Sequence, residues 1–390
     1  MKMCVFRIVI AVAAVQATVC GCMSVSEPNG ISAKVKNPVK VGIYVGAGAR
    51  SNGVCHWETL TTLSPDLEPT FLDEKTIAAG GLDGLDVLAM PGGSSYEEFD
   101  TLKTTGADVK IKEFIRNGGG YVGTCAGNCL VLNEERRLRL TPYEREKSSD
   151  RHGTALLGIK FNEEATRLCG IKAGTRKIRY SGGPIMKPGK PVAGANFKTI
   201  AEYDCDLVCE YGTNTAEIAQ MKGAPAAICG TYGKGRVFAI AVHPEYREDT
   251  LDLVEKGFEY AVGRKVRLGQ RQCTRGDLRV VVYAPGMSGI EDARMVAGLA
   301  TARGIDVTYM NLKEEIGVGL MNHADVLVLP GGSESVYSKR FEPGAEAFFR
   351  KFAEQGGKVF SCGAGAKHAP AGATICASPA EIVECVKAER

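Results

Sequence analysis

Short apolar runs alternate with amphipathic stretches along most of the chain. Runs such as 41–45 and 237–242 have the length and composition of strands that are buried on both faces, which is typical of a parallel sheet. Between such runs lie helical patterns, for example 109–116, which ends at Asn117-Gly118 as a helix C-terminus does. Alternating strands and helices predict an α/β fold with a doubly wound parallel sheet and right-handed crossovers.

The same order of signals occurs twice. The apolar run that begins at Val41 is followed by the Pro-Gly-Gly triplet 91–93, and the run that begins at Val280 is followed by the triplet 330–332. The proline lies 50 positions after the start of the run in both cases. Internal similarity of this kind predicts one supersecondary plan that is used twice.

Two domains follow from this repeat. We predict a first domain over 40–265 and a second, shortened copy of the same fold over 277–390, separated by a polar, charged stretch. Each copy has a glycine-rich cysteine turn, at Cys125 and at Cys362. Ligands of doubly wound sheets bind beyond the carboxyl ends of the strands, so we expect the Pro-Gly-Gly triplets and both cysteine turns at that edge.

The N-terminus has the pattern of a targeting segment. Lys2 and Arg7 precede an apolar run that is too short to span a bilayer comfortably, so 1–22 is predicted as a signal peptide. Its end resembles a bacterial lipobox, in which Cys22 would be acylated and 23–39 would form a polar tether. An ordinary secretory signal is the alternative. The prediction is an exported protein, lipid-anchored to a bacterial membrane in the cell envelope.

The amino-acid composition limits the kinds of molecule that this protein is expected to bind. Hydrophobic residues make up 44% and charged residues 24% of 390 residues, as in soluble globular proteins. A net charge of +3, without a basic run flanked by aromatic residues, argues against nucleic acid. The 14 cysteines include no C-x-x-C pair, which argues against a zinc ribbon. We predict neither a metal nor a cofactor.

The sequence around Cys125 fits the G-x-nucleophile-x-G elbow. A helix expected to begin in the segment 128–133 would stabilise the thiolate with its positive end, and the backbone N–H of Ala126 would point toward a developing oxyanion. Gly92 and Gly93 would supply the second oxyanion donor, because missing side chains let backbone N–H groups approach a substrate. The alternatives are a buried structural cysteine and a plain tight turn.

The segment His243-Pro244-Glu245 supplies the remaining chemistry. On an extended segment, residues two apart face the same side, so His243 can take the thiol proton while Glu245 orients the ring. A surface histidine beside a glutamate is the alternative. Three further residues between the cysteine turn and this histidine would line the pocket or form an ordinary turn: Tyr180, Ser181 and Gly182.

The second copy departs from this pattern. No His-x-Glu follows Cys362, and the histidine downstream of it is His368, expected on the next helix or loop. We therefore predict a degenerate, largely structural partner domain.

These motifs resemble those of the class I glutamine amidotransferase superfamily. More narrowly, 123–127, 180–183 and 243–245 resemble the amino-terminal domain of eukaryotic biotin-protein ligases, which bacterial exported proteins carry without the ligase. The resemblance covers about 40–263 and implies a flavodoxin-like sheet with a Cys-His-Glu triad. It implies no known substrate. The ligase's glycine-arginine nucleotide motif is absent, so biotin transfer is not predicted, and 233–236 is interpreted as the turn before the last strand.

Two classes of function remain open. One is a cysteine hydrolase that cleaves an amide bond in a small molecule or peptide through an acyl-enzyme, and export favours hydrolysis over amide transfer. The other is a non-catalytic binding or scaffold lipoprotein with a vestigial triad. Fold and triad together do not identify a substrate.

Overall fold

The computed structural model describes residues 35–49, 52–146, 154–206, 221–269, 274–311 and 323–390. The predicted signal peptide, Cys22 and most of the predicted tether lie outside these residues. Among the described residues, no helix has both the length and the apolar character that crossing a membrane requires.

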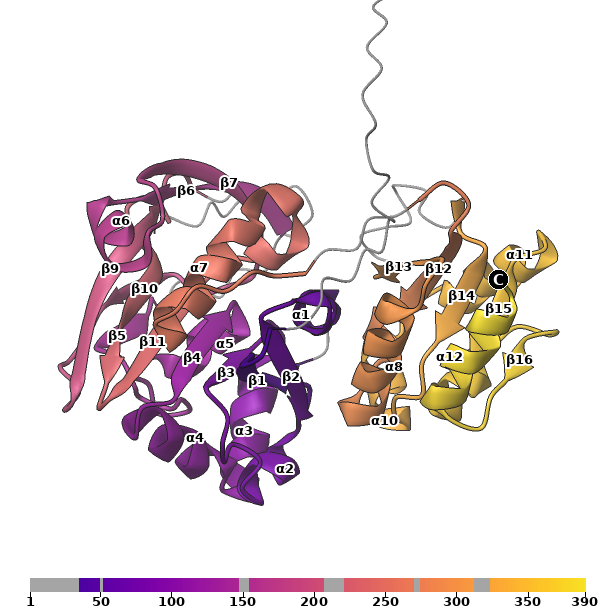
Figure 1. Ribbon diagram of the computed structural model, residues 1–390, viewed down its shortest axis with the longest axis horizontal. Coiled ribbons are helices and arrows are strands. Elements are labelled where there is room, and N and C mark those ends of the chain that lie inside the picture. The colour runs from indigo at the N-terminus through magenta and orange to yellow at the C-terminus, as the bar shows by residue number, and fades with distance from the viewer. Residues whose placement is uncertain (1–34, 50–51, 147–153, 207–220, 270–273, 312–322) are drawn as a thin grey trace, which may run out of the picture.

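The first domain is built on a nine-stranded sheet in the order β2-β1-β3-β4-β11-β10-β9-β6-β7 (Figure 1). Neighbouring strands from β2 to β11 pair in parallel. Their bounds are β1 Val39–Tyr44, β2 Leu67–Leu72, β3 Val87–Met90, β4 Gly120–Thr124 and β11 Gly235–Ile240. Helices connect these strands: α1 Asn52–Leu63, α2 Glu74–Ala78, α3 Ser95–Thr105, α4 Ala107–Arg116, α5 Ala126–Val131 and the last helix, α7 Leu251–Val262.

The central strands explain the apolar runs in the sequence. All four residues of β3 and all five of β4 are buried, because helices cover both faces of the parallel region. The amphipathic helix α4 ends at Arg116 with Asn117 as its C-cap, as predicted. The predicted doubly wound, flavodoxin-like sheet is therefore confirmed.

Four antiparallel strands extend this sheet beyond β11, and the sequence patterns did not predict them. They are β10 Pro225–Tyr232, β9 Ala195–Tyr203, β6 Thr154–Phe161 and β7 Gly174–Ser181, with α6 Glu163–Cys169 between the last two. A small separate pair, β5 Tyr143–Arg145 and β8 Met186–Pro188, also lies in this region. The turn predicted before the last strand is confirmed, since Tyr232 pairs with Gly235 across a tight hairpin.

The second domain has a five-stranded, all-parallel sheet in the order β13-β12-β14-β15-β16. Its strands are β12 Leu278–Tyr283, β13 Ile305–Met310, β14 Val326–Leu329, β15 Lys358–Ser361 and β16 Thr374–Ile375. Its helices are α8 Gly289–Thr301, α10 Glu334–Arg340, α11 Ala345–Glu354 and α12 Pro379–Ala388. The first four strands repeat the order β2-β1-β3-β4.

Matching hydrogen bonds show how closely the two copies agree. The Lys40 N–H donates to the Asp86 carboxylate at 2.9 Å, and the Arg279 N–H donates to the Asp325 carboxylate at the same distance. Both aspartates directly precede the third strand of their sheet. The second, shortened copy of the fold is therefore present in structure as well as in sequence.

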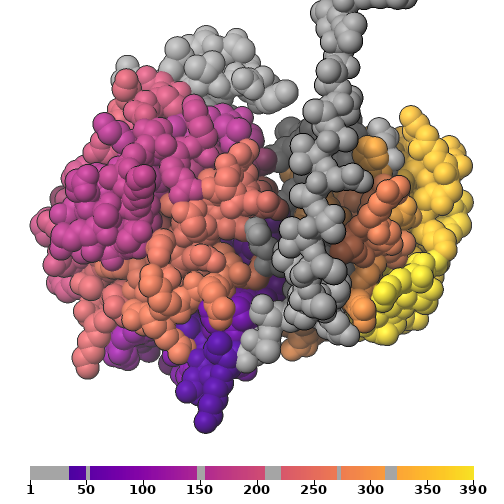
Figure 2. All heavy atoms as spheres, turned by 45° about the horizontal axis from the view of Figure 1, so that its top comes forward, coloured from indigo at the N-terminus to yellow at the C-terminus, as the bar shows by residue number. Residues whose placement is uncertain are grey.

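The two sheets meet through α1 and α8, which pack against each other (Figure 1). The Cys55 thiol of α1 lies 3.3 Å from the Met287 sulfur, within the second domain's core, and the Thr59 hydroxyl is hydrogen-bonded to Tyr309. Figure 2 shows the first domain in indigo to salmon and the second in orange to yellow, side by side. The second copy thus borders the first domain at α1 and the edge strand β2.

Candidate active site

Cys125 lies in the sharp turn between β4 and α5. Its φ of 50° and ψ of −105° are unusual for a residue with a side chain, a conformation that costs about 1–3 kcal/mol. The turn leaves no room for flanking side chains: a Cβ on Gly127 would lie 2.0 Å from the Met90 carbonyl oxygen, and one on Gly123 would lie 2.7 Å from Gly127. This is the strained strand-to-helix turn that a nucleophile elbow requires.

His243 and Glu245 lie just beyond the carboxyl end of β11. His243 Nδ1 and Glu245 Oε1 are 2.7 Å apart, and the Thr124 hydroxyl donates to the same carboxylate oxygen at 3.3 Å. Both residues are buried. The expectation of an extended segment is wrong, because Pro244–Tyr246 forms a short 3₁₀ turn, η2, whose first position suits proline. The turn still brings the carboxylate to the ring.

The Pro-Gly-Gly loop after β3 passes against both the cysteine and the histidine. A Cβ on Gly92 would lie 2.5 Å from His243 Cε1 and 3.2 Å from Cys125 Cβ. The Cys125 thiol donates to the Ser181 carbonyl oxygen at 3.6 Å, and only 6% of the residue is exposed. Four segments from different parts of the chain therefore meet at the carboxyl edge of the sheet.

Electrostatics favour a protonated His243. Burial of the ring acts to lower the pKa of His243, but the charges of Cys125 and Glu245, and hydrogen bonds to both side chains, outweigh burial and raise the pKa to about 10. These charges favour the imidazolium form of the ring, which lies between the cysteine and a carboxylate. Such a group can stabilise a thiolate and later give a proton to a leaving amine.

Comparison with known proteins agrees with this geometry. Residues 39–131 match the model of the family described as biotin-protein ligase, N terminal, a segment that runs from β1 through the cysteine turn to the end of α5. The pyridoxal 5'-phosphate synthase subunit PdxT of Bifidobacterium adolescentis is 28% identical over 174 residues, which are 43% of this chain and 79% of that protein. The first domain is thus similar to class I glutamine amidotransferase-like proteins, and its residues 39–131 are similar to the biotin-protein ligase N-terminal family.

Other relatives are more distant. The PdxT subunit of Ignicoccus hospitalis is 24% identical over 181 residues, 43% of this chain and 74% of that protein. A solved glutamine amidotransferase is 18% identical and covers 56% of this chain and 97% of its own, with a TM-score of 0.38. The two PdxT relatives support a cysteine-dependent, amide-hydrolysing class for the amidotransferase-like domain.

The predicted oxyanion donors lie on either side of Cys125. Ala126 is the first residue of α5, so its N–H has no acceptor within the helix. Gly92 faces the cysteine and histidine, whereas Gly93 packs against the loop after β1, where a Cβ would lie 2.2 Å from the Gly48 carbonyl oxygen. The oxyanion roles of Ala126, Gly92 and Gly93 remain predictions.

The three residues predicted to line the pocket differ in their surroundings. The Ser181 carbonyl contacts the Cys125 thiol, and Gly182 adopts a left-handed conformation with φ of 71° directly after it. Tyr180 is fully buried, and its hydroxyl donates to the Gly183 carbonyl oxygen at 3.0 Å. The Tyr180 ring therefore supports this turn of the amidotransferase-like domain from within the core.

Sequence reasoning missed a second histidine near the site. The His56 ring of α1 lies 4.9 Å from the Tyr246 ring, which in turn lies 5.3 Å from the His243 ring, centroid to centroid. Burial lowers the pKa of His56 to about 4, against the opposing charge of Glu245, so this ring is neutral at pH 7. The chain has five histidines, and that scarcity was the one available signal.

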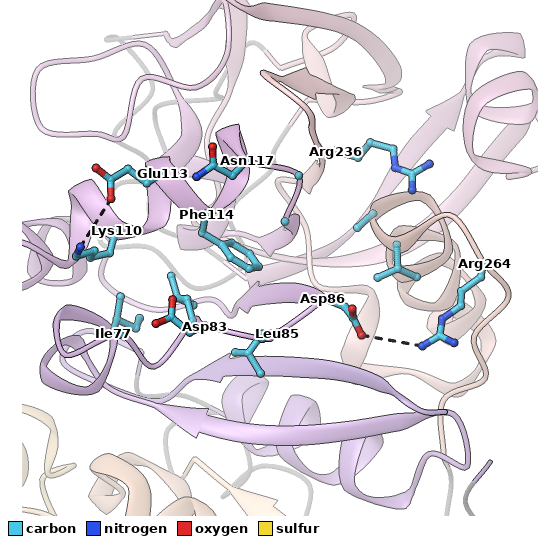
Figure 3. A pocket seen from close by; sticks show the side chains of 17 residues that line it. Ile77, Asp83, Leu85, Asp86, Lys110, Glu113, Phe114, Asn117, Arg236 and Arg264 are labelled. Carbon is cyan, nitrogen blue, oxygen red and sulfur yellow. Dashed lines mark ion pairs between the residues drawn. The ribbon is translucent and has the colours of Figure 1, made fainter. Parts of the chain in front are cut away.

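A hollow of about 670 Å³ lies at the opposite, amino edge of the parallel strands (Figure 3). Leu85 and Asp86 precede β3, and Arg236 lies near the start of β11. The Asp86–Arg264 ion pair crosses part of the opening. This hollow belongs to a different edge from Cys125 and contributes nothing to its chemistry.

No group of three or more His, Cys, Asp or Glu side chains that could hold a metal occurs within the described ranges. In the second copy, His368 ends a 3₁₀ turn that begins after Cys362, and its ring stacks on Phe341 at 4.2 Å. Its Nδ1 lies 2.9 Å from Glu346 Oε1. His368 is therefore engaged with Phe341, which follows α10, and with Glu346 of α11, and not with a triad.

Proposed function

We propose that the protein is an exported cysteine hydrolase that cleaves an amide bond in a small molecule or peptide. Cys125 is the nucleophile, His243 the proton carrier and Glu245 the group that orients it. The observation that carries the proposal is the buried His243–Glu245 hydrogen bond beside a cysteine in a strained turn. A cysteine with only a structural role would require neither the His243–Glu245 hydrogen bond nor the strained turn.

The reaction follows from these positions. The Cys125 thiolate attacks the amide carbonyl carbon, and backbone N–H groups of Ala126 and the Gly92 loop stabilise the oxyanion. His243 gives its proton to the nitrogen as the carbon–nitrogen bond breaks, which leaves a thioester. Water, deprotonated by His243, then attacks the thioester and releases the acid and the thiolate.

A non-catalytic binding or scaffold protein with a vestigial triad is the second candidate. It is favoured by one observation, the small exposed fraction of Cys125, which is 6%. Little of this residue is therefore accessible to a substrate in this structure.

Selective labelling of Cys125 tests the proposal. Because the imidazolium of His243 stabilises a thiolate, iodoacetamide at mildly acidic pH should alkylate Cys125 faster than the buried thiols Cys169 and Cys229. Peptide mass spectrometry after short exposures measures the three rates. Equal rates at all three cysteines would favour the scaffold.

The predicted lipid anchor is tested separately. If Cys22 is acylated, the mature protein partitions into the detergent phase, and Cys22→Ser moves it to the aqueous phase. Mass spectrometry of the mature N-terminus checks the modification directly. A mature chain that begins at another residue would contradict the anchor without affecting the proposed chemistry.

A further inference from the structure

The second copy retains the parts of an elbow site. Gly331 and Gly332 follow β14, and Cys362 follows β15, as Gly92, Gly93 and Cys125 follow β3 and β4. A Cβ on Gly331 would lie 3.3 Å from the Cys362 sulfur, so the glycine loop lies directly beside the thiol. The place where an oxyanion would sit in an active copy is therefore still present.

A carboxylate of the same chain fills that place. Asp292, in the first turn of α8, accepts hydrogen bonds from the Gly331 N–H at 3.1 Å, the Gly332 N–H at 3.0 Å and the Ser288 N–H at 2.7 Å. Only 1% of Asp292 is exposed, and no ion pair joins it to a cation among the described residues. In the part of the chain that the structure describes, three backbone amides hold this buried carboxylate.

Burial and charge determine the protonation of both the Asp292 carboxyl group and the Cys362 thiol. Burial raises the pKa of Asp292 to about 6 against the effect of the three amides, so at neutral pH the group is an anion. Burial, and then the charge of Asp292, raise the pKa of Cys362 to about 12. The thiol beside the carboxylate therefore stays protonated.

The first copy has no carboxylate at the corresponding place on its first helix, α1, although the buried Glu98 of α3 lies against its Gly93. The first turn of α1 begins Asn52-Gly53-Val54 and contains no acidic residue. The difference between the two copies at this edge is thus more than the missing His-x-Glu: one helix turn carries a carboxylate and the other does not.

We propose that the loop 330–332, together with the Ser288 N–H, is a carboxylate-binding site that Asp292 occupies from within the chain. Removal of the Asp292 side chain opens this site to a small external carboxylate, held beside Cys362. The site lies outside the proposed triad and stands whether or not the first domain is catalytic.

Paired alkylating reagents test the site. Iodoacetate carries a carboxylate and iodoacetamide does not; with either, the Cys362 sulfur bonds to the CH₂ carbon, iodide leaves and the thiol proton passes to solvent. In Asp292→Ala the ratio of iodoacetate to iodoacetamide labelling at Cys362 should rise about tenfold over wild type, because the amides then bind the reagent's carboxylate. Formate should compete and lower the ratio.

Controls separate this effect from general loosening. Cys205, a partly exposed thiol in the first domain, serves as the internal reference and should keep its ratio in every variant. Glu291→Ala removes an exposed carboxylate from the same helix turn and should leave the ratio at Cys362 unchanged. If Asp292→Ala does not fold, the same labelling ratio is measured in Asp292→Ser.

An unchanged ratio at Cys362 in the folded Asp292 variant overturns the proposal. So does a rise that formate does not suppress, since access to the thiol would then have increased without a carboxylate site. A parallel rise at Cys205 would likewise show that the variant had loosened as a whole.

Discussion

Cys125→Ala should abolish amide turnover, and His243→Ala should cost nearly as much. The loss should reach several powers of ten in kcat, because nucleophile and proton carrier act as a unit. For the same reason the double variant should be little worse than either single one. A panel of amides and small peptides must first identify a substrate, and kcat on that substrate is the measurement.

The second copy provides a matched control for this experiment. Cys362→Ala removes a buried thiol from the equivalent turn, where no imidazole supports it, so turnover should stay close to wild type. Loss of turnover in Cys362→Ala but not in Cys125→Ala would reverse the assignment. If neither change mattered, the activity would not come from these sites and the scaffold would be favoured.

Glu245→Gln separates orientation from proton transfer. The amide keeps the shape of the side chain but removes the charge that helps to raise the pKa of His243 to about 10. Turnover should fall by roughly two to four powers of ten. The alkaline limb of the rate profile should also move to lower pH, because His243 then loses its proton earlier.

The parallel part of the fold could be predicted because local patterns specify it. β3 and β4 are buried on both faces, so their sequences are continuous apolar runs, and the repeat of those runs revealed the second sheet. The antiparallel extension could not be predicted in the same way. In β7, exposed and buried residues mix as Gly174–Ser181 passes along the sheet edge, and the pattern is weak.

The residues of the two sites also differ in whether the sequence could predict them. Cys125 and His243-Pro244-Glu245 belong to local motifs, and their residue types indicate nucleophilic and acid–base chemistry. His56 and Asp292 belong to helix turns without a motif, and only the packing of each helix in its own domain brings His56 near Tyr246 and Asp292 near Gly331. Long-range contacts of this kind leave no periodicity in the sequence.

Gly92→Ala should disable the site without removing any reacting group. The new Cβ would lie 2.5 Å from His243 Cε1, which is too close for real atoms, and 3.2 Å from Cys125 Cβ. The ring cannot easily move away, because it is buried and held to Glu245 at 2.7 Å. A displacement approaching 1 Å between reacting groups costs about a hundredfold in rate, so kcat should fall by about that factor.

Gly331→Ala is the matched control for this change. Its Cβ would lie 3.3 Å from Asp292 Oδ1 and from the Cys362 sulfur, distances that small shifts relieve, and neither residue serves the proposed reaction. Both variants should remain folded, with overpacking at Gly92 costing about 1–3 kcal/mol of unfolding free energy. Thermal unfolding checks the fold and kcat checks the site. A folded Gly92→Ala protein with wild-type kcat would show that the cysteine and histidine need no close contact with this loop, and the triad mechanism would fail with it.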